Sequence, residues 1–252
     1  ATTEIYTLSL HDALPIYAIV QSAWRSADPG LHFATTINEW NPVPNDGEIR
    51  TSNPCSEVFA LDGNSCNLAS LRLTAFYDWE TREFNLGALE HAARLWTIML
   101  DITVKSSSYP TERIAWVTNQ YNLVGLGITD LGGLVMGMGL PYDSDAARQI
   151  GGALMAIICA VAWKTSAELS RELGAYPRFE ANREHHLRVI RNHLALACGR
   201  PEDLEGISHP PLHLDPEKIP TRHRGLVERA KELWREALQM GEAFGYRNAS
   251  VT

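Results

Sequence analysis

The sequence predicts a helix-rich α/β protein, and three observations lead to that fold class. Apolar side chains recur at helical spacing from about residue 89 onward. Short extended segments lie around two cysteines, Cys55 and Cys66, and again at the end of the chain. The composition, 45% hydrophobic and 21% charged over 252 residues, is that of a globular protein with a sizeable core. Because helices and short strands are mixed along one chain, an α/β layout is favoured over an all-helical one.

Turns and extended segments dominate the first third of the chain. A helix is predicted over 17–27, where an Asp-Pro-Gly turn ends it, and a strand is predicted over 31–40. Residues 41–47 are expected to form a loop, because their prolines and closing Asp-Gly pair favour turns. Beyond the cysteines, a strand over 68–76 should lead into a hairpin-like return over 78–84.

The rest of the chain is mostly helix. The longest helix is expected to start at Ser144, a good N-cap residue, and to stop at Gly174. Residues 199–220 are predicted to be a linker interrupted by prolines, and 247–252 the start of a strand that the sequence cuts off. The predicted helices cover 89–100, the segment after Pro110, 128–138, 144–173, 182–196 and 222–244.

Charge and cysteine content argue against several classes of protein. A formal net charge of −8 does not suit a protein that binds duplex DNA or RNA, whose surface would be basic. The four cysteines form no Cys-x-x-Cys pair and no Cys/His cluster at zinc spacing, so no metal site is expected. Reduced thiols and a cytoplasmic location are the default interpretation. The longest apolar run, 150–163, is too short to cross a bilayer and predicts a buried helix, with no membrane span.

The first sixteen residues are interpreted separately. Residues 1–16 have no basic n-region and no apolar run before a small-residue cleavage site, so they are not a signal peptide. They resemble an in-frame translation of a sequencing adapter. We therefore expect a non-native segment over 1–16 and one domain over 17–252.

One stretch concentrates the reactive groups. Asn53, Cys55 and Glu57 alternate along a segment that Pro54 biases toward extended backbone, so their side chains should share one face. A nucleophilic cysteine would need a histidine or a cation beside it to form a thiolate. Here the neighbour is a carboxylate, which disfavours the thiolate and favours chemistry by a neutral thiol, such as loss of a hydrogen atom.

Other noticeable residues are assigned structural roles. Gly125-Leu126-Gly127 lacks the spacing of a dinucleotide-binding loop and is attributed to close helix packing. His185, His186 and His193 are expected to be solvated groups on a basic helix. Structural positions are also expected for Trp96, Trp163, Trp234, Cys159 and Cys198.

The motif at 53–57, Asn-Pro-Cys-Ser-Glu, followed by Cys-Asn-Leu-Ala-Ser-Leu from Cys66, resembles the catalytic segment of ribonucleotide reductases. The likeness is to the adenosylcobalamin-dependent class II enzymes in particular. It covers nearly everything after residue 16 and includes short matches at 23–30, 35–38, 125–127, 141–144, 166–169 and 246–249.

This resemblance implies part of a ten-stranded α/β barrel, in which a finger loop carries a radical cysteine to the centre. By motif match that residue is Cys55, whose thiyl abstracts hydrogen from the ribose 3′ carbon. Glu57 matches the acid/base residue at the 3′ hydroxyl, and Asn53 matches the amide that positions the ribose hydroxyls. Cys66 matches one of two thiols that reduce the 2′ position. The implied cofactor is adenosylcobalamin, and the implied partners are a ribonucleoside di- or triphosphate, a dithiol reductant such as thioredoxin, and a second copy in a homodimer of the full-length enzyme.

Two departures from the family leave alternatives open. No cysteine precedes Cys55 to pair with Cys66, and the family's phosphate-binding turn would lie beyond residue 252. The chain is therefore expected to be a fragment without turnover on its own. One alternative is a fragment of a class I large subunit, whose radical comes from a separate metal-containing subunit. The other is a non-catalytic helical interaction protein in which Cys55 and Cys66 form a structural or sensing disulfide.

Overall fold

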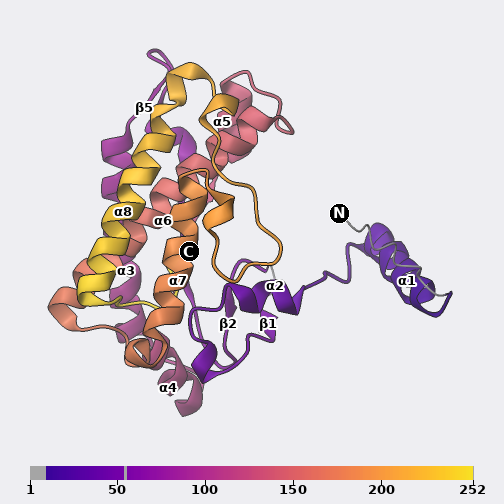
Figure 1. Ribbon diagram of the computed structural model, residues 1–252, viewed down its shortest axis with the longest axis vertical. Helices are drawn as coiled ribbons and strands as arrows, with labels where there is room; N and C mark the ends of the chain where they lie inside the picture. The colour runs from indigo at the N-terminus through magenta and orange to yellow at the C-terminus, as the bar shows by residue number, and fades with distance from the viewer. Residues whose placement is uncertain (1–9, 54–55, 252) are drawn as a thin grey trace. The chain divides into compact units, whose positions relative to one another are not determined.

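The computed structural model describes residues 10–53 and 56–251 and divides the chain into two compact units, before and after Thr35. The first unit holds α1 (Leu10–Ser26), which confirms the helix predicted over 17–27. The short helix α2 (Ala34–Glu39) begins at the boundary. The second unit contains the other helices, shown in Figure 1: α3 (Leu86–Ser106), α4 (Glu112–Tyr121), α5 (Leu131–Gly137), α6 (Asp145–Leu173), α7 (Phe179–Ala197) and α8 (Gly225–Phe244).

The expectation for residues 1–16 is only partly covered by the structure. Residues 1–9 lie outside the described residues, and 10–16 form the first part of α1. The assignment of 1–16 as a non-native segment stays a prediction.

The long helix α6 begins and ends where its sequence signals predict. The Ser144 hydroxyl oxygen accepts a hydrogen bond from the Ala147 N–H at 3.1 Å, which caps the first turn. Gly174 ends the helix with a φ of +83°, a conformation that glycine adopts without a steric cost. The helices predicted over 182–196 and 222–244 are also confirmed, as α7 and α8.

α6 is the core of the second unit. α3 and α8 pack along it, and α7 packs on α8. Its apolar stripe, which includes Ile150, Leu154 and Ile157, is completely buried. By length and composition α6 could cross a membrane, but 72% of its most apolar stretch is buried inside the fold. This burial matches the core helix that the sequence predicts.

A parallel pair of strands lies beside these helices. β3 (Asn67–Arg72) pairs with β6 (Val124–Thr129), and α3 and α4 form the connection between them. The other edge of β6 meets the end of the chain, because the Val124 N–H donates to the Ser250 carbonyl at 3.1 Å and the Leu126 N–H donates to the Val251 carbonyl at 3.0 Å. Residues 250–251 therefore run along the edge of β6, although the described part of the predicted strand over 247–252 forms no regular strand.

Two short hairpins complete the described strands. β4 (Tyr77–Asp78) pairs antiparallel with β5 (Glu83–Phe84), which confirms the hairpin-like return predicted over 78–84. β1 (Thr51–Ser52) pairs antiparallel with β2 (Phe59–Ala60), so that Thr51 faces Ala60 and Ser52 faces Phe59. The β1–β2 hairpin flanks the Asn-Pro-Cys-Ser-Glu motif. The result is a helix-rich α/β arrangement as predicted, without a closed barrel in the part of the chain that the structure describes.

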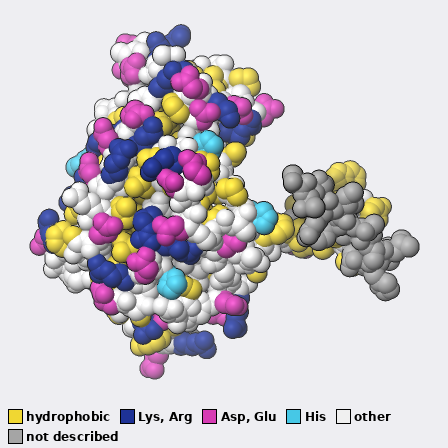
Figure 2. Space-filling model, in the orientation of Figure 1, with side chains coloured by type: hydrophobic (Ala, Val, Ile, Leu, Met, Phe, Trp, Pro, Cys, Tyr) yellow, Lys and Arg dark blue, Asp and Glu magenta, His cyan; other side chains and the backbone are white. Residues whose placement is uncertain are grey.

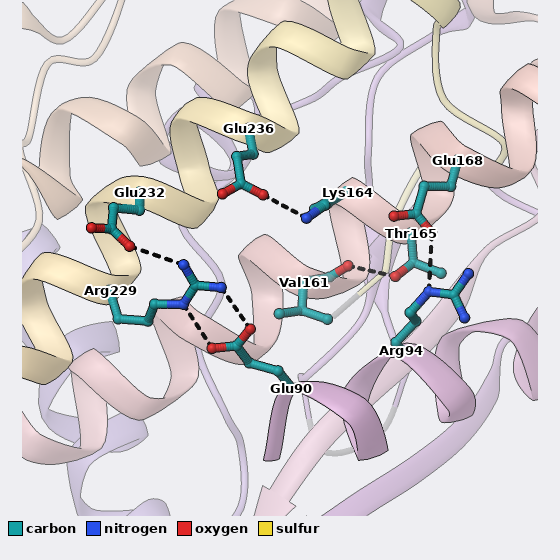
Figure 3. Close-up of polar contacts among 9 residues, drawn as sticks. All are labelled: Glu90, Arg94, Val161, Lys164, Thr165, Glu168, Arg229, Glu232 and Glu236. Atoms are coloured by element: carbon teal, nitrogen blue, oxygen red, sulfur yellow. Dashed lines mark hydrogen bonds and ion pairs between the residues drawn. The ribbon is translucent and has the colours of Figure 1, made fainter. Parts of the chain in front are cut away.

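Charged side chains link the outer faces of the packed helices. Figure 3 shows Arg229 of α8 bound through two nitrogens to Glu90 of α3, at 2.7 and 2.8 Å, and Lys164 of α6 bound to Glu236 of α8 at 2.5 Å. These pairs are partly exposed, so each adds little to stability. Figure 2 shows basic and acidic side chains interspersed over the visible face.

Two predicted elements differ from the structure. The strand predicted over 31–40 is wrong, because 34–39 forms α2. The Asn38 side chain bonds to the Ile49 backbone in the way that a neighbouring strand would. Its amide oxygen accepts from the Ile49 N–H at 2.9 Å, and its amide nitrogen donates to the Ile49 carbonyl at 3.0 Å. The strand predicted over 68–76 is shorter, since a 3₁₀ turn begins at Leu73.

The glycine-rich segment also differs from its prediction. Gly125 and Gly127 lie in β6, so the helix predicted over 128–138 starts only at Leu131. A Cβ atom on Gly125 would lie 2.5 Å from Cδ2 of Leu68 on the neighbouring strand. Gly125 therefore permits close packing between strands, where the sequence had suggested close packing between helices.

The histidine and tryptophan assignments need correction. His186 is fully buried, its Nδ1 lies 3.0 Å from the Tyr176 hydroxyl, and burial lowers the pKa of His186 to about 3. His193 stacks on Trp234 with ring centroids 4.9 Å apart. Neither is a solvated surface group, because the face of α7 that bears them packs into the fold.

Trp163 and Trp234 are buried as predicted, but Trp96 is 46% exposed, since the buried stripe of α3 runs through Thr97.

Candidate functional site

The described motif residues Asn53, Ser56 and Glu57 belong to a segment whose ends are joined by hydrogen bonds between Asn53 and Val58. The Asn53 side-chain oxygen accepts from the Val58 N–H at 3.0 Å, and the Asn53 N–H donates to the Val58 carbonyl at 3.2 Å. The Asn53 carbonyl also accepts from the Ser56 N–H at 3.1 Å. Ser56 has a φ of +64°, which turns the chain sharply. Asn53 thus fixes both ends of the loop that carries the motif.

The predicted site residues differ in how far they are described and in how much they are exposed. Cys55 lies outside the described residues. Asn53 is half-buried, and its amide oxygen is used within the loop, which leaves the amide N–H groups to donate to a ligand. Glu57 is exposed, and Cys66 is half-buried with a free thiol.

Two adjoining cavities lie around this loop. The first, the thiol cavity, has a volume of about 380 Å³ and is lined by Asn53 and Cys66. The second, the aromatic cavity, has a volume of about 360 Å³ and is lined by Glu57. The motif residues are therefore divided between the two cavities. Four residues line both of them: Ala60, Leu61, Asn64 and Leu123.

Cys66 is held as a neutral thiol. Burial, together with the nearby Glu57 carboxylate, raises the pKa of the Cys66 thiol to about 11. At neutral pH the sulfur keeps its proton, and the S–H group points to the Asn67 carbonyl at 3.6 Å. A thiol beside a carboxylate suits hydrogen-atom or proton-coupled redox chemistry better than nucleophilic attack by a thiolate.

Neighbouring side chains fix the position of Cys66. The Ser65 N–H donates to the hydroxyl of the buried Thr118 on α4 at 3.0 Å, and the Asn67 amide donates to the Thr103 hydroxyl on α3 at 2.8 Å. Both α3 and α4 belong to the connection between the parallel strands. The crossover that builds the sheet therefore also places the thiol.

Comparison with known proteins supplies the family. The profile described as "Ribonucleotide reductase, barrel domain" matches residues 15–252. The chain belongs to the ribonucleotide reductase barrel-domain family. It is 47% identical over 237 residues to a protein of Agrobacterium fabrum, 46% identical over 231 residues to one of Bradyrhizobium diazoefficiens, and 39% identical over 234 residues to one of Rhodopirellula baltica. All three relatives are named vitamin B12-dependent ribonucleotide reductase.

These matches cover most of this chain and little of each relative. They span 93%, 92% and 93% of this chain, but only 18%, 18% and 21% of the three relatives. The chain thus corresponds to about a fifth of the length of these ribonucleotide reductases.

A buried carboxylate that sequence reasoning missed fastens the segment before the motif. The side chain of Asp46 is only 4% exposed. It accepts hydrogen bonds from Arg178, through Nε at 2.9 Å and also through Nη2, and from the Asn182 amide at 2.7 Å. Burial by itself would raise the pKa of Asp46, but these bonds outweigh it and hold the pKa below its usual value. No local pattern could reveal the pair, because 132 residues separate its members.

Asn248 is a second polar residue that the sequence did not single out as a site. It is fully buried, and its amide donates to Asp101 of α3 at 3.1 Å and to the Asn122 carbonyl at 2.9 Å. Its side-chain oxygen accepts from the hydroxyl of Ser166 on α6 at 2.9 Å. Asn248 therefore fixes the point where the chain enters the extended segment beside β6.

The described side chains offer no metal centre. No group of three or more histidine, cysteine or acidic side chains gathers within residues 10–53 and 56–251 in a way that could hold a metal ion.

Proposed function

We propose that this chain is the part of a vitamin B12-dependent ribonucleotide reductase that carries the radical-bearing cysteine and one of its redox thiols. Membership of the family and the names of the similar proteins support this proposal. The observation that carries it is the position of Asn53, Glu57 and Cys66 around two adjoining cavities, with Cys66 kept neutral by burial and by Glu57.

Each motif residue has a role in this proposal. Cys55 forms the thiyl radical that abstracts the hydrogen of the ribose 3′ carbon. Glu57 takes the proton of the 3′ hydroxyl, and the Asn53 amide N–H groups donate to a ribose hydroxyl. Cys66 supplies one of the two electrons and protons that reduce the 2′ position as its C–O bond breaks and water leaves. A second thiol, from outside this chain, supplies the other electron and the other proton. It then forms a disulfide with Cys66.

Adenosylcobalamin, when bound, supplies the radical that starts the reaction. The aromatic cavity, at about 360 Å³, has room for a nucleoside-sized group and not for a corrin ring. The described residues therefore fit the adenosyl part of the cofactor, and the corrin must be held elsewhere in the longer enzyme.

The remaining expectations belong to the whole enzyme. The row formed by β3, β6 and residues 250–251, with α3 and α6 against it, is consistent with part of a ten-stranded barrel. The substrate is a ribonucleoside di- or triphosphate and the reductant a dithiol protein such as thioredoxin. A homodimer and a cytoplasmic location complete the proposal.

A chimera tests the proposed function. Residues 17–252 replace the corresponding segment of the Agrobacterium fabrum relative, and cobalamin-dependent conversion of ribonucleotide to deoxyribonucleotide is measured. The chimera should turn over, and Cys55→Ser should abolish turnover because a hydroxyl does not yield its hydrogen atom to the initiating radical. Glu57→Gln should reduce turnover by about 10²-fold or more, as expected for loss of an acid/base group.

The matched control is Cys159→Ser. Cys159 is a residue of α6 that packs against the apolar core, and it lines neither cavity. This variant should retain turnover. A chimera that remains fully active with Cys55→Ser would disprove the proposed role of Cys55.

A further inference from the structure

The outer face of α3 carries an apolar stripe. Its four members lie within about two helical turns, and each is about half exposed: Leu95 (45%), Trp96 (46%), Met99 (51%) and Ile102 (53%). Residues three and four positions apart are neighbours on a helix surface, so these side chains form one continuous strip. The opposite face of α3 is also mainly apolar and packs against α6, β3 and β6. A helix that is apolar on both faces is typical of the interior of a larger protein.

The outer face of α8 provides a comparison. α8 packs on the same core helix, α6, as α3 does. Every exposed position of α8 between 226 and 240 is polar or charged: Glu228, Glu232, Arg235 and Gln239. A solvent-facing helix of this protein therefore has a polar outer face, and the stripe on α3 is an exception that requires a partner.

A positive charge lies at one end of the stripe. Lys105 is one turn beyond the last member of the stripe, and its ammonium donates to the Asn119 side-chain oxygen at 2.9 Å and to that of Asn122 at 2.6 Å. Both acceptors are neutral amides. Burial and, after it, the nearby Arg247 lower the pKa of Lys105, although Asp101 opposes them. A carboxylate brought to Lys105 by a partner would therefore be stabilising.

The size of the stripe limits what can cover it. Four large side chains, each about half exposed, leave roughly 400 Å² of apolar surface, which is half of the area of about 800 Å² that each partner buries in a standard interface between separate proteins. A face this small is better suited to a segment of the same polypeptide, because the covalent link removes most of the cost of association.

The chemistry of the stripe also limits its partner. The stripe offers apolar side chains, and the backbone of α3 behind them is already hydrogen-bonded within the helix. A covering segment must therefore satisfy its own backbone groups, as a second helix does. The three relatives supply ample chain for such a helix, because this chain covers only 18%, 18% and 21% of their length.

We propose that the apolar stripe of α3 is the docking site of an amphipathic helix from the part of the longer reductase that lies outside this chain, and that a carboxylate of that helix pairs with Lys105. The inference rests on the proposed function, which makes this chain part of a longer enzyme.

Oxidative footprinting tests whether the stripe is covered. Hydroxyl radicals oxidise exposed methionine and tryptophan side chains, and mass spectrometry measures each rate against a reporter peptide added to every sample. Met99 and Trp96 should be oxidised at least about fivefold more slowly in the chimera with the Agrobacterium fabrum relative than in the 252-residue chain. Equal rates in the two proteins, or protection that is already present in the 252-residue chain, would overturn the inference.

Dilution distinguishes a helix of the same polypeptide from a second copy. Protection by a covalently linked helix should not change when the chimera is diluted, because its local concentration is fixed by the chain. Protection that disappears on dilution would identify a second copy and overturn the inference. Acylation of the Lys105 amine should also be slower in the chimera, and an unchanged rate would overturn the proposed ion pair.

A substitution gives a second readout. Met99→Glu should leave the melting temperature of the 252-residue chain unchanged, because Met99 faces solvent there, and should lower that of the chimera, because it buries a carboxylate among apolar groups. The matched control is Gln239→Glu, which places the same side chain on the polar face of α8 and should change neither protein. A chimera that tolerates Met99→Glu as well as Gln239→Glu would contradict the inference. The Bradyrhizobium diazoefficiens relative supplies a second scaffold if the first chimera fails to fold.

Protection and turnover are separate readouts of the chimera. A chimera that turns over while Met99 is oxidised as fast as in the 252-residue chain would overturn this inference and leave the proposed function standing. A folded chimera that protects Met99 but does not turn over would support the docking site and count against the proposed function.

Discussion

The helical body and the site region of this chain are held together in different ways. α3, α6 and α8 pack against one another through buried apolar side chains. Many weak contacts together supply the stability of this packing. The segments 38–53 and 56–58 are instead held mainly by single asparagine side chains: Asn38 binds Ile49, Asn41 binds Val43 and Gly47, and Asn53 binds Val58. Stability is therefore spread widely in the body, whereas the shape of the site depends on a few polar residues.

Truncation of an apolar side chain in the helical body should produce the largest loss of stability. Leu154 of α6 is fully buried, and Leu154→Ala should lower the free energy of unfolding by about 2–5 kcal/mol through lost packing and the cavity left behind. Chemical denaturation measures the loss. Leu95→Ala on α3 is the control, because Leu95 is 45% exposed and should change the value by less than about 0.5 kcal/mol. Equal losses for the two variants would contradict the assignment of α6 as the core.

Removal of the Asp46 carboxylate should cost less stability but disturb the site more. Asp46→Ala should lower the free energy of unfolding by about 1–3 kcal/mol, because Asn182 loses a partner while the half-exposed Arg178 can turn to water. Hydrogen exchange of the amides in 41–53 should rise at the same time, since this segment loses its attachment to α7. Asp143→Asn, at an exposed position, should change neither quantity.

The Asp46 carboxylate should make the fold less stable as the pH falls. The folded-state pKa of Asp46 lies below its unfolded value, so its contribution is complete above the unfolded pKa and is lost as pH falls through the folded one. The stability of the parent should therefore fall in acid more steeply than that of Asp46→Ala. Parallel acid-denaturation curves for the two proteins would refute this.

The smallest expected effect concerns the acidity of Cys66. Burial is the main cause of its raised pKa and Glu57 the second, so Glu57→Gln should lower the pKa of about 11 only modestly. Alkylation of Cys66 followed by mass spectrometry, as a function of pH, measures this shift. The parent thiol should react slowly at neutral pH and faster as pH approaches 11, and Glu57→Gln should move that rise to lower pH. The control is Glu202→Gln, at an exposed position, which should leave the profile unchanged.

The same difference between regions explains what could be predicted from the sequence. α6 and α8 follow from periodic apolar residues and from local end signals such as Ser144, which act within a few positions. The motif could be located, but its loop closure by Asn53 and the division of Asn53 and Glu57 between two cavities could not. The Asp46–Arg178 pair and the burial of His186 are set by elements far apart in the sequence, and no local pattern encodes them. Trp96 differs from its predicted core position because α3 directs Thr97, not Trp96, into the core.

The position of β6 also affects the order in which the chain can fold. One edge of β6 pairs with β3, which is synthesised shortly before it, but the other edge pairs with residues 250–251, which are synthesised only after α6, α7 and α8. Until then β6 presents an open edge to any other extended chain nearby. Contacts between residues this distant in sequence form slowly, so this pairing should form late and the growing chain should be most prone to aggregate before that step.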